Sequence, residues 1–269
     1  MAMSKSSETR KAKSVELVCK YVPAGSRILE ISCGSGEVLD ALQQQGYRVK
    51  GTNFTKYEGV IADLDIDNGI DILSELPYED SSFDAVLLLD VIQHLSNHDH
   101  ALSELARVCS DNGHVIVMTQ NTTRLASRLH FFLTGFVKAK RAFIGFDVPR
   151  EYAFAFHNYP PHLPTFLYQL RSHSLQLVEF TAAVYKFKSF LLYPLLFPIT
   201  WLATTYKIHC CEKYLKKTSA AKELQQTMTS VSALCGEFWF TVSRKDQNVP
   251  DLQTKLPTWS QKWKSAKAE

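Results

Sequence analysis

Apolar and polar positions along the first half of the chain predict strands and helices in alternation. Short apolar runs with the length and composition of strands occur at residues 27–31, 83–89 and 113–119, and the mixed segment at 48–53 is the expected second strand. Stretches that repeat apolar residues every three or four positions, and so predict helices, occur at residues 6–21, 37–45 and 97–109. The run at 83–89 is nearly continuous, as expected for a strand buried on both faces of a parallel sheet. This alternation predicts an α/β fold with a doubly wound, mostly parallel sheet.

The turn after the first predicted strand consists of small residues. Glu30 lies near the end of the strand, and the turn contains Ser32, Cys33, Gly34 and Gly36 before the next helix begins. Such a turn lets the backbone approach a ligand at the start of a helix. The unit therefore predicts a cofactor-binding domain.

Spacing within this turn separates two classes of cofactor. A dinucleotide fingerprint has a small residue three positions beyond its second glycine, where this chain has Leu39. Residues 30–36 fit the order acidic, any, small, any, Gly, any, Gly. This pattern resembles motif I of the class I S-adenosylmethionine-dependent methyltransferases, type 11 group, although the family usually has glycine in place of Ser32. Residues 71–86 resemble the family's segment leading into its fourth strand.

The resemblance implies a Rossmann-like domain with seven strands and S-adenosyl-L-methionine as the cofactor. It rests on specific motifs over residues 28–119 and only on the order of elements over 161–244. We expect the sixth strand at 176–187 and the seventh at 235–244. The predicted parts are one methyltransferase domain at 1–245, a cap after strand five at 121–160, a hydrophobic and basic insertion between strands six and seven at 188–232, and a flexible tail at 246–269.

Several cofactor contacts follow from the resemblance. Glu30 would contact the cofactor, and the backbone of the turn with Ser32, Cys33, Gly34 and Gly36 would hold the methionine part. Asp90 would lie beside them at the end of strand four, and the first helix would cover this sheet edge.

The ribose and adenine contacts come from the next strands. Asn53 occupies the place of the family's acidic ribose ligand, so an uncharged amide predicts weaker binding of the ribose. Asp71 would bind the adenine amino group and Ile72 would pack on the ring. Other alignments place an acid nearby, at Asp63, Asp65 or Asp67. A solvated acidic loop remains the alternative.

Three residues are candidates for catalysis. His94 follows strand four, at the carboxyl edge where ligands of such sheets bind, and His157 and Tyr159 lie in a proline-rich connection. Related methyltransferases often have a histidine at the place of His94. A packed or cofactor-lining role is the alternative for each histidine. Methyl transfer could also proceed without a base, through alignment and desolvation.

Composition restricts the setting. A chain of 269 residues with 45% hydrophobic residues can form a full core, and its net charge of +3 does not suggest a nucleic-acid binder. The six cysteines show neither disulfide-scaffold density nor the Cys-x-x-Cys spacing of zinc sites. We therefore expect reduced thiols, no metal and a cytoplasmic protein. The polar start of the chain shows no secretory leader.

The cap segment is basic and aromatic. Residues 121–150 contain six Lys or Arg residues, one acidic residue (Asp147) and several phenylalanines. We interpret it as the element that recognises an anionic acceptor. A solvated helix with snorkelling cations is the alternative.

The insertion begins with an uncharged segment at 189–206 that is slightly short for a bilayer span and contains Pro194 and Pro198, which should break a helix. We expect it to contact the membrane peripherally, helped by lysines at 207–217. A soluble lid or dimer contact, or a spanning helix, are the alternatives.

These observations predict a methyltransferase that modifies an oxygen, in preference to nitrogen or carbon, because the Asn/Asp-Pro-Pro-Tyr box for planar nitrogens is absent. The acceptor would be a small molecule, lipid or glycan at the inner face of the membrane. Two alternatives remain: a catalytically silent binding module with the same fold, and an NAD(P)-dependent oxidoreductase.

Overall fold

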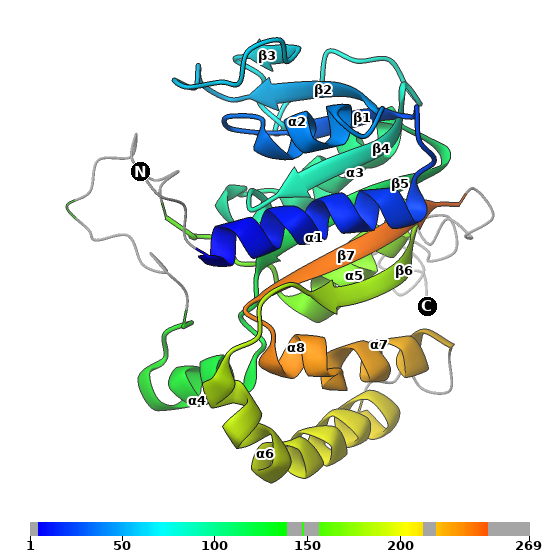
Figure 1. Ribbon diagram of the computed structural model, residues 1–269. Helices are drawn as coiled ribbons and strands as arrows, with labels where there is room; N and C mark the ends of the chain where they lie inside the picture. The colour runs from blue at the N-terminus through cyan, green and yellow to red at the C-terminus, as the bar shows by residue number, and fades with distance from the viewer. Residues whose placement is uncertain (1–4, 139–146, 148–155, 212–218, 247–269) are drawn as a thin grey trace, which may run out of the picture.

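The fold is built on a seven-stranded sheet (Figure 1). The computed structural model describes residues 5–138, 147, 156–211 and 219–246. In spatial order the strands are β3 (Ile66–Asn68), β2 (Arg48–Asn53), β1 (Arg27–Ile31), β4 (Phe83–Leu89), β5 (Cys109–Gln120), β7 (Phe238–Lys245) and β6 (Leu175–Ala182). All neighbours are parallel except β7, which runs antiparallel to both β5 and β6. The predicted doubly wound, mostly parallel sheet is confirmed.

Helices cover both faces of the sheet. The helices α1 (Lys5–Tyr21) and α2 (Glu37–Gln43) pack on one face, and α3 (His98–Val108) and α5 (Leu163–Ser172) pack on the other. Successive side chains of β4 point to opposite faces of the sheet. Leu87 belongs to the apolar cluster under α1 and α2, and Leu88 belongs to the apolar cluster under α3 and α5. Both are fully buried. The continuous apolar run of β4 is thus explained by a strand whose two faces are both covered.

The order of the strands determines where a ligand binds. From β1 the chain goes outward to β2 and β3, then returns to β4 on the other side of β1. This creates a switch point at the carboxyl ends of β1 and β4, the usual ligand site of such sheets. Ser32 and Asp90, the first residues after these strands, have positive φ angles of 56° and 63°. The backbone therefore turns sharply at both strand ends.

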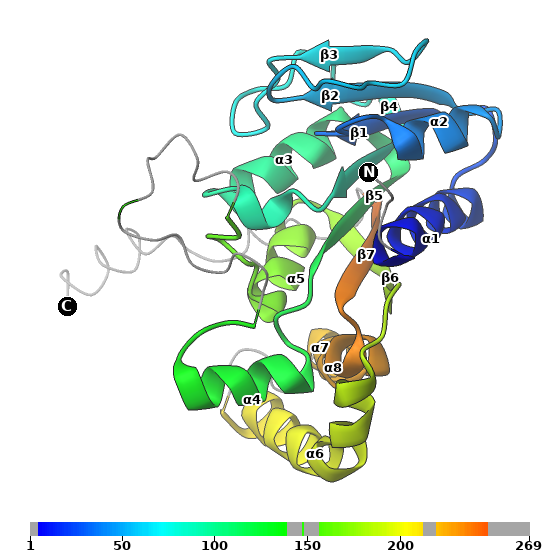
Figure 2. The same cartoon turned by 60° about the vertical axis from the view of Figure 1, so that its left-hand side comes forward.

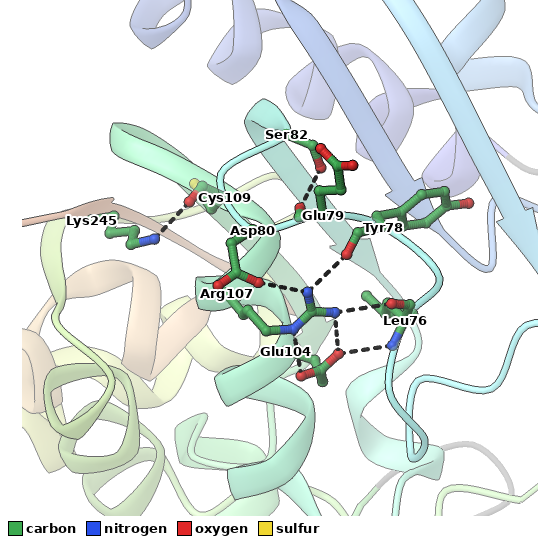
Figure 3. Close-up of polar contacts among 9 residues, drawn as sticks. All are labelled: Leu76, Tyr78, Glu79, Asp80, Ser82, Glu104, Arg107, Cys109 and Lys245. Atoms are coloured by element: carbon green, nitrogen blue, oxygen red, sulfur yellow. Dashed lines mark hydrogen bonds and ion pairs between the residues drawn. The ribbon is translucent and has the colours of Figure 1, made fainter.

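Arg107 on α3 fixes the segment that leads into β4 (Figure 3). Its guanidinium donates to the backbone carbonyls of Leu76 (3.0 Å) and Tyr78 (2.8 Å) and to the carboxylates of Glu104 and Asp80. Glu104 also accepts from the backbone N–H of Leu76 at 2.8 Å. The hydrogen bonds from Arg107 lower the pKa of the Glu104 carboxyl. One network of charged side chains thus holds the segment before β4, within residues 71–86, to α3.

The insertion between β6 and β7 forms helices. They are α6 (Phe187–Tyr206), the π-helical turn η3 (Lys207–Cys211), α7 (Ser219–Thr229) and α8 (Val231–Cys235). The sixth strand was expected to reach residue 187 but ends at Ala182, and the seventh begins at Phe238 because residues 231–235 are helical. Residues 212–218 lie outside the described part, as do 139–146 and 148–155 of the cap and 247–269 of the tail.

The prolines do not break α6, so that expectation was wrong. Pro194 and Pro198 lie inside one continuous helix. Figures 1 and 2 show α6 changing direction after its first turns, which is how a helix accommodates proline. Together with α4 (Leu125–Thr134) and α8, α6 surrounds a small separate core of Leu125, Leu234 and Cys235.

Candidate cofactor and acceptor site

A cavity of about 510 Å³ lies at the switch point. Its floor comes from the ends of β1, β4 and β5, and α1 lies over it as a cover. The lining residues are Ser7, Arg10, Lys11 and Ser14 from α1; Glu30 and Ser32 to Ser35 from β1 and its turn; Glu37 and Val38 from α2; and Tyr57, Leu89, Asp90 and Met118. The structure thus brings together Glu30, Ser32, Cys33, Gly34 and Asp90, five of the predicted cofactor contacts.

Backbone hydrogen bonds hold the small-residue turn to β2. Cys33 N–H donates to Thr52 O at 2.9 Å, and Ser32 N–H donates to the Thr52 hydroxyl at 3.3 Å. Gly36 N–H donates to Cys33 O at 3.1 Å. These donors have partners inside the protein, so the turn contributes chiefly shape. Its small side chains leave the cavity open beside the backbone.

Gly36 is required for a reason that the sequence did not reveal. Its φ is +84°, and a Cβ there would overlap the Leu64 side chain. Gly36 does not line the cavity. Glycine is therefore needed for the left-handed backbone and for the close approach of Leu64.

Asn53 binds the turn. Its Oδ1 accepts from Gly34 N–H at 2.8 Å, and its Nδ2 donates to Gly34 O at 3.0 Å. An aspartate could make only the first of these bonds, because a carboxylate has no donor. Asn53 is buried and lies outside the cavity lining. The amide that departs from the family pattern thus braces the turn, and the ribose contact stays a prediction.

Glu30 is a buried carboxyl group in the cavity wall. Its Oε2 has no hydrogen-bond partner. Burial raises the pKa of Glu30 to about 8, and the positive charge of Lys11 opposes that rise. A buried carboxylate without a partner is costly, so a cationic group entering the cavity would be stabilised here. The amino group of the methionine part of S-adenosylmethionine is such a cation, so the residues present fit this cofactor.

Two ion pairs close α1 over the cavity. Arg10 Nη1 lies 2.7 Å from Asp90 Oδ2, and Lys11 pairs with Glu37 on α2. Burial lowers the pKa of Lys11. The pair between Arg10 and Asp90 joins residues 80 positions apart. The sequence analysis missed Arg10, Lys11 and Tyr57, because no local motif marks such contacts.

Asp71 and Ile72 lie outside the cavity lining. Asp71 Oδ1 accepts from Leu73 N–H at 2.9 Å, and the Ile72 side chain is buried in the core cluster with α3. Two of the competing acids, Asp65 and Asp67, both pair with Lys50. The assignment of the adenine to Asp71 and Ile72 therefore stays a prediction.

The catalytic candidates meet beyond β4 and β5. The rings of His94 and His157 are 4.9 Å apart, edge to face. His94 Nδ1 lies 2.9 Å from Phe156 O, and His157 Nδ1 lies 2.9 Å from the side-chain oxygen of Gln120. Because these oxygens only accept, each Nδ1 carries the hydrogen. Nε2 of His94 is then the ring nitrogen with a lone pair, and it lies 3.4 Å from the side-chain nitrogen of Gln93.

Gln93 links this histidine pair to the cofactor cavity. Its side-chain N–H donates to Asp90 Oδ1 at 2.8 Å, and its oxygen accepts from the Thr119 hydroxyl at 2.7 Å. Its backbone O accepts from Tyr159 N–H at 3.0 Å, and the Tyr159 side chain is about half exposed. The structure thus gathers His94, His157 and Tyr159 beside Asp90, at the edge where an acceptor would meet the cofactor.

Thiol and metal chemistry find no support at this site. Burial raises the pKa of the Cys33 thiol to about 12, so it is protonated at neutral pH. The six cysteines are free. Within the described residues, no group of three His, Cys, Asp or Glu side chains could hold a metal ion.

The strand order, the antiparallel β7 and the cavity at the switch point define a Rossmann-like methyltransferase fold. Residues 29–117 match the family described as "Methyltransferase domain". This match covers about a third of the chain and agrees with the resemblance of residues 28–119 to the class I S-adenosylmethionine-dependent methyltransferases, so it supports a methyltransferase domain with S-adenosylmethionine as the cofactor.

One curated relative is the ubiquinone biosynthesis O-methyltransferase of Maricaulis maris (strain MCS10), 34% identical over 39% of this chain and 44% of the relative. The chain spans no more than half the length of the first curated relatives. Among solved structures, an S-adenosylmethionine-dependent methyltransferase from Archaeoglobus fulgidus has a TM-score of 0.51 at 15% identity, covering 87% of this chain and 94% of the other. The [4+2]-cyclase SpnF has a TM-score of 0.50 at 15% identity, covering 87% and 80%. These structural likenesses show the fold alone.

Proposed function

We propose that this protein transfers a methyl group from S-adenosylmethionine to an oxygen of a small, lipid-linked or glycan acceptor at the inner face of the membrane. The observation that carries the proposal is the cavity at the switch point, with the unpartnered Glu30 carboxyl in its wall. The sequence motif that resembles the methyltransferase family and the Glu30 carboxyl, which a bound cation would stabilise, both lie at this cavity.

Each part of the chain has a separate task in this proposal. Bound S-adenosylmethionine supplies an electrophilic methyl group. Glu30 orients the cofactor through its amino group, and α1 with Arg10 excludes water from the cavity. In this proposal His94 Nε2, which lies 3.4 Å from the side-chain nitrogen of Gln93, accepts the proton of an acceptor hydroxyl. The preference for oxygen is supported by the Maricaulis maris relative, which is named an O-methyltransferase.

The location at a membrane is supported by α6. Phe187–Cys211 is long and apolar enough to cross a bilayer, and 6% of its most apolar window is buried. An acceptor with a lipid anchor would be available at such a surface.

A direct search for the acceptor tests the activity. Lipid and glycan fractions of cells are incubated with the purified chain and S-adenosylmethionine carrying a deuterated methyl group, and the products are analysed by mass spectrometry. The proposal predicts one labelled species, methylated on oxygen, whose amount falls with His94→Gln.

The alternative of a catalytically silent module makes a different prediction. It requires S-adenosylhomocysteine to bind while no labelled product forms in either fraction. The cyclase SpnF shows that this fold occurs in proteins not named as methyltransferases, so the experiment is decisive and the fold is not.

A further inference from the structure

The helix α6 has two apolar sides, and only one of them is packed. Leu192, Tyr193, Leu196 and Phe197 pack against the small core of Leu125, Leu234 and Cys235. On another side, an apolar stripe at helical spacing is between 62% and 69% exposed: Leu191, Leu195, Ile199, Leu202 and Tyr206. A helix that is apolar nearly all round is normally buried on all sides. Something outside this chain is therefore expected to cover the stripe.

The second half of α4 extends the same surface. Phe132 and Leu133 are 84% and 70% exposed, and Phe131 and Phe136 are more than half exposed. The helices α4 and α6 contact each other. Figures 1 and 2 both show them together at the end of the molecule farthest from β3. We call the exposed side chains of 129–136 and the α6 stripe the α4–α6 face.

Charge indicates what covers this face. Residues 124–138 and 186–211 contain no Asp or Glu and six Lys or Arg residues, of which Arg124 is buried and Lys186 pairs with Glu237. Lys138, Lys188 and Lys207 are exposed and lie at the ends of the apolar segments. An apolar face bordered by lysines matches an anionic lipid surface, where the chains receive the apolar side chains and the headgroups attract the cations.

The other occupants fit less well. A second copy of the chain would bring two cationic faces together in a symmetric dimer, with like charges in apposition. A spanning position for α6 would remove Leu192, Leu196 and Phe197 from the core that they share with α4 and α8. The helix is therefore held against the domain and can offer only its outer side.

We propose that the α4–α6 face docks onto an anionic bilayer, with α4 inserting beside an α6 that lies along the membrane plane. This inference rests on the proposed function and narrows its substrate class. The helix α4 begins at Leu125, five residues beyond Gln120, whose side chain contacts His157. The helix whose far half carries part of the α4–α6 face thus begins close in sequence to the histidine pair. The acceptor is then an amphiphile that reaches the histidine pair from the bilayer.

Cosedimentation of the full chain with vesicles tests the docking. Vesicles of phosphatidylcholine alone are compared with vesicles that contain about 30% phosphatidylglycerol. This anionic lipid gives the vesicle surface a negative potential. The wild type is expected to bind the anionic vesicles at least tenfold more strongly, and 0.5 M salt, on the order of several times physiological ionic strength, should reduce that difference. Equal binding to both, or a lipid-free dimer that does not bind vesicles, would overturn the proposal.

Substitutions separate α4 from α6 and from the catalytic function. Phe132→Glu on α4 and Leu195→Glu on α6 should each weaken binding to anionic vesicles by roughly tenfold or more, because each removes an inserting side chain and adds a charge. The matched control is Tyr168→Glu, an exposed aromatic residue on α5. If Phe132→Glu binds like the control, α4 does not insert and the inference fails.

Cofactor binding is measured in parallel on the same proteins. Titration with S-adenosylhomocysteine should give the same affinity for wild type, Phe132→Glu and Tyr168→Glu, since none of these positions lines the cavity. Vesicle binding without cofactor binding would contradict the proposed function and leave the docking intact. Cofactor binding without vesicle binding would contradict the docking and the membrane location, and would leave the methyl-donor part of the proposed function intact.

Discussion

Glu30 shows how one buried side chain couples stability to the cofactor site. Its carboxyl is buried and lacks a partner for Oε2, and burial raises its pKa from 4.5 to about 8. In the unfolded chain the group ionises near 4.5, whereas the folded chain retains the proton up to about 8. Within that window the unfolded state binds fewer protons, so folding stability falls as pH rises, and the loss is complete above the folded pKa.

Glu30→Gln removes this titration. The variant should match the wild type near pH 4.5 and become more stable than it by about 4–5 kcal/mol at pH 8 and above. Urea unfolding across that pH range measures the difference. If the difference in unfolding free energy between the variant and the wild type did not change with pH, the pKa of Glu30 would not be raised by burial. The same variant should bind S-adenosylhomocysteine more weakly, because its amide offers no charge to the amino group.

Two glycines with similar backbone angles separate strain from steric fit. Gly36 and Gly46 have φ angles of +84° and +87°. A Cβ at Gly46 meets open space within 4 Å, whereas a Cβ at Gly36 overlaps Leu64.

Gly46→Ala should therefore cost about 1 kcal/mol of unfolding free energy, from the left-handed backbone alone. Gly36→Ala should cost about 1–3 kcal/mol more, because Leu64 and the turn must move, and it should weaken S-adenosylhomocysteine binding. Chemical denaturation and calorimetric titration of both variants check this. If both variants lost the same unfolding free energy, the Leu64 side chain would move without cost and the turn would tolerate a side chain at residue 36.

Residue roles were less predictable than residue positions. The motif of small residues correctly led to the cavity, because it is a local pattern with a local cause. Asn53 was placed correctly at the end of β2, but its bonds to Gly34 depend on how two strands approach each other. Arg10 and Lys11 had no signature, since their partners Asp90 and Glu37 lie far along the chain.

At the scale of elements, the Arg107 network joins α3 to the segment before β4. Arg107 makes five hydrogen bonds and leaves Glu104 buried beneath it. Arg107→Met should destabilise the protein by about 2–4 kcal/mol, because a buried carboxylate and two backbone carbonyls lose their hydrogen-bond donor.

The matched control is Arg171→Met, which loses a single 3.3 Å pair with the half-exposed Glu223. It should cost less than about 1 kcal/mol. Urea unfolding at neutral pH measures both. If the two variants lose equal stability, the network does not hold this segment.

Element boundaries followed the apolar pattern where that pattern had a single explanation. β2 and β4 have the predicted limits, because turn residues bound each run. The sixth strand was drawn too long, since the apolar run continues into α6 and an apolar run alone does not distinguish strand from helix. The prolines of α6 misled for a related reason: neighbouring packing holds the helix together across them.

The whole molecule combines a Rossmann-like cofactor domain with an additional layer formed by α4, α6, α7 and α8. The sheet and its two helical layers carry the cavity, and the appended layer carries the exposed α4–α6 face (Figure 2). The sequence pattern predicted two separate parts, a cap at 121–160 and an insertion at 188–232. It could not predict that α4 joins α6, because their contact is tertiary.

Titration of the full chain with S-adenosylhomocysteine tests the central claim most directly. Isothermal calorimetry at neutral pH should show saturable binding at one site per chain, abolished by competing S-adenosylmethionine and unaffected by NAD. Arg10→Ala should weaken it, because Arg10 lines the cavity and closes α1 onto Asp90. An absence of saturable heat, or a preference for NAD, would contradict the assignment of this cavity to the methyl donor.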